Sequence, residues 1–148
     1  MNKRLTIAIQ KNGRLSAQSK NLINKSGISF NSKADKLLAK SSNLPVDILF
    51  VRDDDIPSLV SNGDADLAIV GENVLIEKTL FKKKNIIKSL DLGFSKCRLS
   101  IAAPENSRFK SLRNKKIATS YPNVLKKYLK DNSIEATVIN IHGSVELT

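Results

Sequence analysis

The sequence predicts an α/β fold built around a mostly parallel sheet, and two observations lead to this class. Short runs of Ile, Val and Leu recur at residues 5–9, 46–51, 65–70, 116–119 and 136–141. Stretches with helical patterning and helix-capping residues follow most of these runs. Strands that are apolar almost throughout are typical of parallel sheets covered by helices on both faces.

The N-terminal elements begin with the strand at residues 5–9, which a turn connects to a helix. Ser16 is expected to cap this helix over residues 17–26, and Gly27 is expected to end it. Residues 31–43 are largely polar around a Leu-Leu pair, and we expect a short helix or a loop there.

Two further strand–helix pairs follow. The strand at 46–51 precedes a helix that opens at Asp53-Asp54-Asp55, carries Pro57 in its first turn and ends at Gly63. The strand at 65–70 leads through Gly71-Glu72-Asn73 into a helix that ends near Thr79.

The second half of the chain is predicted to form a separate lobe. Residues 86–92 and 99–103 read as two strands, and the polar segment between them marks the expected division into lobes of residues 1–93 and 94–148. A strand at 116–119, a helix from Pro122 or Asn123 to about Asn132, a strand at 136–141 and a helix beginning at Ser144 complete the expected elements.

Composition and charge narrow the function. The 148 residues carry 25 Lys and Arg against 14 Asp and Glu, a net charge of +11, which favours nucleotides, phosphorylated sugars or nucleic acid as partners. Aromatic residues are only 5% with no Trp, which disfavours the stacking surfaces that bind nucleic acid strands. Cys97 and His142 are each single, so neither a disulfide framework nor a zinc site is expected, and a reducing cytoplasm fits best. No membrane span or signal peptide is predicted.

Candidate binding residues lie where strands are followed by helices, because ligands of open α/β sheets gather at the carboxyl ends of strands. Lys11 and Arg14 offer two cations for phosphate, and Gly13 lets the backbone approach a ligand; a plain surface turn is the alternative. Asp53-Asp54-Asp55 could hold the Mg²⁺ of a bound pyrophosphate, although helix capping is favoured for Asp54 and Asp55.

The turn at Gly71 and Glu72 offers amides for a phosphate and a carboxylate for a base or ribose, with simple capping as the alternative. Between the two strands predicted at 86–103, a crossing segment gathers four polar candidates: Asp91, Lys96, Cys97 and Arg98. Cys97 is expected to be a small buried thiol rather than a nucleophile, because no base is near it in sequence. Neither a Walker A sequence nor Gly-x-Gly-x-x-Gly occurs, which disfavours P-loop kinases and Rossmann dehydrogenases.

These segments together resemble the ATP phosphoribosyltransferase family, the first enzyme of histidine biosynthesis, and most closely its long form with an extra regulatory domain. The matching stretches cover nearly the whole chain: Lys11-Asn12-Gly13-Arg14-Leu15, Val51 to Pro57, Asp66 to Leu75, Asp91 to Leu99, Lys116 to Pro122 and Gly143-Ser144-Val145-Glu146. None is decisive alone, but the set in this order is specific.

The resemblance implies a two-lobed fold similar to type II periplasmic binding proteins, with the second lobe incomplete in this chain. It implies transfer of 5-phosphoribosyl from phosphoribosyl pyrophosphate to N1 of ATP, with release of pyrophosphate and with Mg²⁺ bound to the substrates. By that resemblance Lys11, Gly13 and Arg14 would face phosphates, Gly71, Glu72, Asp91, Lys96, Cys97 and Arg98 would line the nucleotide and pyrophosphate region, and Glu146 would lie near the ribosyl site. It implies neither a protein nucleophile nor a protein metal ligand.

Two departures from the family pattern bear on activity. Lys36 stands where members often have Arg, and a Lys lacks the bidentate fork, so pyrophosphate contacts there would be weaker. The sequence also stops at Thr148, before the loop that in the family cradles the 5′-phosphate, so a fragment or an inactive truncated copy is expected. A homo-oligomer is expected at full length. The rival hypothesis is a non-catalytic cytosolic module of the same fold that binds small anions; a nucleic-acid-binding protein is a weaker one.

Overall fold

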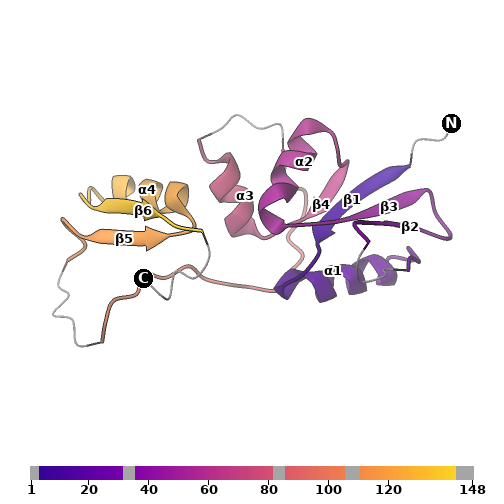
Figure 1. Ribbon diagram of the computed structural model, residues 1–148, viewed down its shortest axis with the longest axis horizontal. Coiled ribbons are helices and arrows are strands. Elements are labelled where there is room, and N and C mark those ends of the chain that lie inside the picture. Colours follow the sequence, from indigo (N-terminus) through magenta and orange to yellow (C-terminus); the bar gives the residue numbers. More distant parts are fainter. Residues whose placement is uncertain (1–3, 32–35, 82–85, 106–110, 143–148) are drawn as a thin grey trace. The chain divides into compact units, whose positions relative to one another are not determined.

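The computed structural model describes residues 4–31, 36–81, 86–105 and 111–142 (Figure 1). Its contacts divide the chain into two compact units, residues 1–96 and 97–148. Among the described residues, the first unit holds a four-stranded sheet and the second a two-stranded one. The predicted mixed α/β class with parallel pairing is confirmed.

The sheet of the first unit has the strand order β2-β3-β1-β4. Strand β1 (Leu5–Gln10) lies between β3 (Val46–Val51) and β4 (Leu67–Ile69) and is parallel to both. Strand β2 (Leu38–Lys40) is antiparallel to β3. Because β1, β3 and β4 run in the same direction, their carboxyl ends meet at one edge of the sheet.

Helices cover both faces of this sheet (Figure 1). Helix α1 (Arg14–Lys25) lies on one face, where Ile23 packs with Ile9 and Ile48. On the other face, Ile56 at the start of α2 (Ile56–Asn62) packs with Ala8. The alternation of Ala8 and Ile9 sends neighbouring side chains of β1 into opposite layers. Each fully buried Ile contributes about 1.5–3 kcal/mol of hydrophobic stabilisation.

Two further helical elements follow β3 and β4 in the first unit. The 3-10 turn η1 (Asp53–Asp55) connects β3 to α2, and α3 (Glu72–Thr79) follows β4 and packs against α2 and η1. Gly63 ends α2 with a φ of 81°, as the sequence predicted for a C-terminal glycine.

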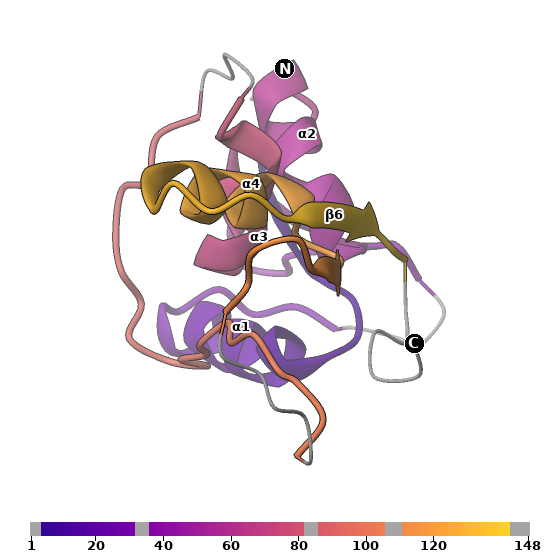
Figure 2. The same cartoon turned by 90° about the vertical axis from the view of Figure 1, so that its left-hand side faces the viewer.

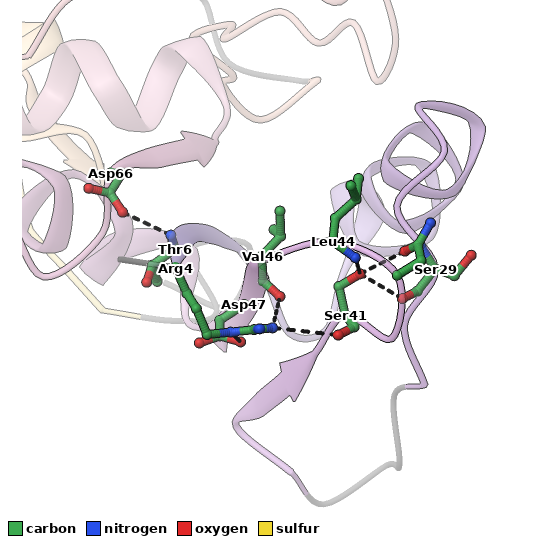
Figure 3. Close-up of polar contacts among 9 residues, drawn as sticks. Arg4, Thr6, Ser29, Ser41, Leu44, Val46, Asp47 and Asp66 are labelled. Carbon is green, nitrogen blue, oxygen red and sulfur yellow. Dashed lines mark hydrogen bonds and ion pairs between the residues drawn. The ribbon is translucent and has the colours of Figure 1, made fainter. Parts of the chain in front are cut away.

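A polar network fastens the amino-terminal edge of the sheet (Figure 3). The Arg4 guanidinium donates to Asp47 Oδ1 at 2.8 Å and to the Val46 carbonyl at 2.8 Å. Ser41 Oγ lies 2.9 Å from the Ser29 carbonyl and accepts from the Leu44 N–H at 3.3 Å. These bonds lie at the opposite edge from the strand-to-helix turns, so they support the sheet without entering those turns.

The second unit pairs β5 (Lys116–Thr119) with β6 (Thr137–Asn140) in parallel. Helix α4 (Pro122–Asp131) connects them, buries Leu125 and Leu129, and lies beside β6 (Figure 2). In the parts of both units that the structure describes, no helix is long and apolar enough to cross a membrane.

Three expectations about elements are wrong. Residues 86–92 and 99–103 form no strands; Ile87 is 86% exposed and Leu90 73%. A strand needs a neighbour for its amides, and in the described structure no strand pairs with either run. Residues 38–40, expected as helix or loop, form β2 because β3 supplies such a neighbour.

The third concerns the start of α1, which begins at Arg14 rather than Ala17. Ser16 does not cap it; its hydroxyl donates to the Lys11 carbonyl at 2.8 Å, inside the first turn. The helix expected from Ser144 falls outside the described residues.

Candidate functional site

Three strand-to-helix turns meet at the carboxyl edge of the first sheet. Residues 11–13 connect β1 to α1, Arg52 connects β3 to η1, and residues 70–71 connect β4 to α3. The Lys11 N–H donates to the Val51 carbonyl at 2.8 Å, which continues the β1–β3 ladder by one bond and joins the first two turns. The backbone and side chains of these three loops therefore lie at the same edge of the sheet.

The turn before α1 depends on Gly13. Its φ of 114° and ψ of −172° place it in a region that is essentially restricted to glycine. Gln10 closes over the same turn, since its Oε1 accepts from the Leu15 N–H at 3.2 Å. A Cβ at Gly13 would lie 2.7 Å from Gln10 Nε2, so both the backbone and the packing require glycine.

This turn carries two cations at the positive end of a helix. Lys11 is half-buried and Arg14 is exposed as the first residue of α1. Cationic side chains at the positive end of a helix dipole are a favourable setting for phosphate oxygens. Lys11, Gly13 and Arg14 thus lie in and directly after one strand-to-helix turn, and their contact with phosphates stays a prediction.

The turn before α3 lies next to the start of α1. Gly71 is the N-terminal cap of α3, and a Cβ there would lie 2.6 Å from Asn73 Oδ1 and 3.7 Å from Leu15 Cδ1. Glu72 is exposed and opens the helix. Leu15 follows Arg14 directly, so Glu72 and Arg14 belong to two helix starts that adjoin.

The segment at residues 88–95 brings Asp91 to this edge through a lysine that the sequence analysis missed. Lys88 Nζ donates to Glu72 Oε1 at 2.8 Å and to Asp91 Oδ1 at 2.9 Å. Hydrogen bonds to Glu72 and then Asp91 raise the pKa of Lys88 to about 12. The only sequence signal for Lys88 was that this cation interrupts the apolar run at residues 86–92. The sequence analysis assigned that run to a strand and gave Lys88 no role.

Ser95 fixes the far end of the same segment. Its hydroxyl lies 3.4 Å from the Arg14 carbonyl and donates to the Gln18 side chain. Ser95 has a φ of 50°, which is uncommon for a residue other than glycine, so these contacts hold a strained backbone. The segment from Lys88 to Ser95 is thus joined to α3 at one end and to α1 at the other.

The remaining predicted residues lie elsewhere or are not described. The Phe50 N–H donates to the Leu37 carbonyl at 2.7 Å, so Lys36 precedes β2 beside the carboxyl end of β3, where it is exposed. Lys96 is exposed at the end of the first unit, and Arg98 is exposed in the second. Glu146 lies outside the described residues.

The expectation of a buried Cys97 is wrong, because the thiol is exposed. It lies in an irregular stretch where no helix or strand among the described residues covers it. Its sequence neighbours, Lys96 and Arg98, are exposed as well.

Asp53 and Asp54, the first two of the three aspartates that follow β3, make contacts within the first unit. Asp53 Oδ1 accepts from the Asp54 N–H at 3.0 Å, and Asp54 pairs with Lys78 at 3.7 Å. Asp55 is the N-terminal cap residue of α2 but makes no side-chain capping hydrogen bond there, so the expected capping by Asp55 is not seen. Across the described ranges, no group of three or more His, Cys, Asp or Glu side chains is placed to hold a metal ion.

Comparison with known proteins relates this arrangement to a family. The family model HisG, described as ATP phosphoribosyltransferase, matches residues 52–148. An ATP phosphoribosyltransferase of Cytophaga hutchinsonii is 49% identical over 146 residues, which are 97% of this chain and 50% of that protein.

A solved structure agrees with these matches. The ATP phosphoribosyl transferase (HisG:HisZ) complex from Thermotoga maritima contains a chain that superposes with a TM-score of 0.73 and 27% identity, covering 97% of this chain and 66% of its own length. The present chain thus spans about half the length of the curated relative it matches. Together these matches show that the chain belongs to the ATP phosphoribosyltransferase family.

Proposed function

We propose that this chain forms the phosphate-binding part of an ATP phosphoribosyltransferase, which transfers 5-phosphoribosyl from phosphoribosyl pyrophosphate to N1 of ATP. The observation that carries the proposal is the meeting of two glycine turns, Lys11 and Arg14 at one sheet edge in a member of this family. The net charge of +11 supports it, because both substrates are polyanions.

Phosphoribosyl transfer requires positive charge at the leaving pyrophosphate and alignment of the two substrates more than it requires a protein nucleophile. As pyrophosphate leaves the anomeric carbon, negative charge grows on the leaving group and positive charge on the ribose. Lys11 and Arg14 would bind the leaving phosphates, and the positive end of the α1 dipole would add to their attraction. Mg²⁺ carried by the substrates would neutralise part of the phosphate charge. Holding both reactants in line can supply about 7–11 kcal/mol of the barrier reduction.

The residues beyond this edge receive roles by the same proposal. Glu72 and Asp91 would line the nucleotide region, and Lys96, Cys97 and Arg98 would continue it. Glu146 would lie near the ribosyl site, and Lys36 would add a weaker phosphate contact at the β2 side. The two units would correspond to the lobes of a fold similar to type II periplasmic binding proteins, in a cytoplasmic homo-oligomer.

The test measures binding and turnover separately. Isothermal titration of ATP and of inorganic pyrophosphate reports the site, and chromatographic detection of phosphoribosyl-ATP reports the reaction. Arg14→Ala should weaken pyrophosphate binding about 10- to 100-fold, the loss of one charge-assisted hydrogen bond of about 1.5–3 kcal/mol.

A matched control is Arg113→Ala, which removes an exposed arginine from the second unit and should leave pyrophosphate affinity unchanged. If both variants weakened pyrophosphate binding equally, the loss of one positive charge anywhere in the chain would explain the effect. Arg14 would then not belong to the site. Binding of both ligands without product, in a protein extended to the full length of the matched relative, would favour the rival hypothesis of a non-catalytic anion-binding module. Arg98→Ala tests the nucleotide region in the same way, with ATP as the ligand.

A further inference from the structure

Lys88 connects two carboxylates at the edge where the phosphates would bind. Its ammonium lies 2.8 Å from Glu72 Oε1 and 2.9 Å from Asp91 Oδ1. The three side chains are 44%, 61% and 76% exposed, respectively. Exposed pairs of this kind contribute little to folding, so stability alone gives Lys88 no clear purpose.

The surroundings of this triad suggest an electrostatic purpose. Gly71, directly before Glu72, lies against Leu15, and Ser95, four residues after Asp91, contacts the Arg14 carbonyl. Glu72 and Asp91 therefore lie on two segments that each contact the start of α1, which carries Arg14. Left alone, they would repel any polyanion that approached this helix.

We propose that Lys88 is a positioning residue that holds the carboxylates of Glu72 and Asp91 and cancels their charge, so that a polyanionic ligand meets a positive field at α1. This inference rests on the proposed function. Among Lys11, Arg14, Lys88, Glu72 and Asp91, three cations face two anions; without Lys88 the charges are equal in number. Lys88 acts through its carboxylate partners and needs no contact with the ligand.

The experiment titrates inorganic pyrophosphate into the full chain and its variants by calorimetry. The buffer contains EDTA, so that freed carboxylates cannot recruit a metal ion and imitate tighter binding. Lys88→Gln should bind pyrophosphate about three- to tenfold more weakly at low ionic strength, and the difference should shrink in about 0.5 M salt as screening increases. Lys88→Arg should restore the affinity.

A matched control is Lys127→Gln in the second unit. Lys127 also pairs with an exposed carboxylate, Asp131 Oδ2 at 2.6 Å, so this variant makes the same change in net charge away from the first sheet. Its pyrophosphate affinity should equal that of the wild type. Urea unfolding midpoints of both variants should match the wild type, which excludes a loss of fold as the cause.

A second variant separates charge cancellation from direct contact. Adding Glu72→Gln to Lys88→Gln removes one of the freed carboxylates and should recover most of the lost affinity. Failure of this recovery, or equal affinity of Lys88→Gln and the wild type, would overturn the role of Lys88. Absence of pyrophosphate binding by the wild type would overturn the proposed function itself, together with this inference.

Discussion

Gly13 allows the sharpest test of how the candidate site is built. Replacing it by Ala forces a side chain into a backbone region that costs about 1–3 kcal/mol for other residues. The new Cβ would lie 2.7 Å from Gln10 Nε2, so the Gln10 amide must move and lose its bond to the Leu15 N–H, worth about 1 kcal/mol. Ala also lowers the conformational entropy of the unfolded chain, which offsets about 0.4–1 kcal/mol of this destabilisation. We expect Gly13→Ala to lower the free energy of unfolding by about 2–3 kcal/mol.

Two companion variants separate backbone strain from packing. Gly27 has a φ of 83° but nothing lies within 4 Å of the position that a Cβ would take there, so Gly27→Ala should lower the free energy of unfolding by only about 1 kcal/mol. In a Gln10→Ala background the crowding disappears, so the effect of Gly13→Ala should fall to the strain alone. The difference is a coupling between residues 10 and 13.

The assay is urea unfolding followed by far-ultraviolet circular dichroism, with pyrophosphate titration in parallel. In a thermal melt of the same variants, each kcal/mol lost from the free energy of unfolding should lower the thermal midpoint by about 2–4 °C for a chain of this size. Pyrophosphate affinity should fall with Gly13→Ala and not with Gly27→Ala, because Lys11 and Arg14 flank residue 13 only. Equal destabilisation by the two variants, or no coupling with Gln10, would refute the reasoning.

Four other changes have definite expected outcomes. Ser19 Oγ is fully buried and has no hydrogen-bond partner in the described structure, so Ser19→Ala should raise the free energy of unfolding by about 1 kcal/mol in the same urea assay. Arg4→Met leaves the Asp47 carboxylate, 16% exposed, without its cation, and should destabilise by about 1–3 kcal/mol; adding Asp47→Asn should recover part of this loss in chemical denaturation. Cys97→Ser should keep most of any turnover, while the exposed wild-type thiol should react readily with iodoacetamide; turnover lost by orders of magnitude would make the thiol catalytic. Hydrogen bonds to Glu72 and Asp91 raise the pKa of Lys88 from 10.5 to about 12, and the small stability linked to this shift is present below pH 10.5 and lost as the pH rises through about 12; the unfolding midpoints of wild type and Lys88→Gln should therefore match at pH 7 and at pH 9 alike.

The fold was predictable where a strand and the strand that pairs with it both lie in apolar runs of the sequence. The strands at 46–51 and 116–119 have their predicted bounds, because unbroken Ile, Val and Leu runs flanked by turns have few alternatives. Strand β2 was missed since Leu, Ala and Lys are good helix formers and only its pairing with β3 makes it extended. The runs at 86–92 and 99–103 show the reverse error, in which local propensity was read without a partner strand.

The candidate site was predictable to the level of its turns. A strand followed by Gly13 or Gly71 and a helix locates a loop at the carboxyl edge, whatever the side chains do. Two contributions depend on folded geometry instead. Gln10 reaches over its own turn to the Leu15 N–H, and Lys88 bonds Glu72 across 16 positions of sequence. No periodic pattern encodes such side-chain contacts.

The exposed run at residues 86–92 also has a consequence for solubility. Its sequence, Ile-Ile-Lys-Ser-Leu-Asp-Leu, contains four large aliphatic side chains and no Pro, the composition of segments that self-associate as cross-β structure. Lys88 and Asp91 are the only charges that interrupt it, and so they act as gatekeepers against aggregation. Neutralising both at once should make the protein scatter light at concentrations where either single variant stays clear.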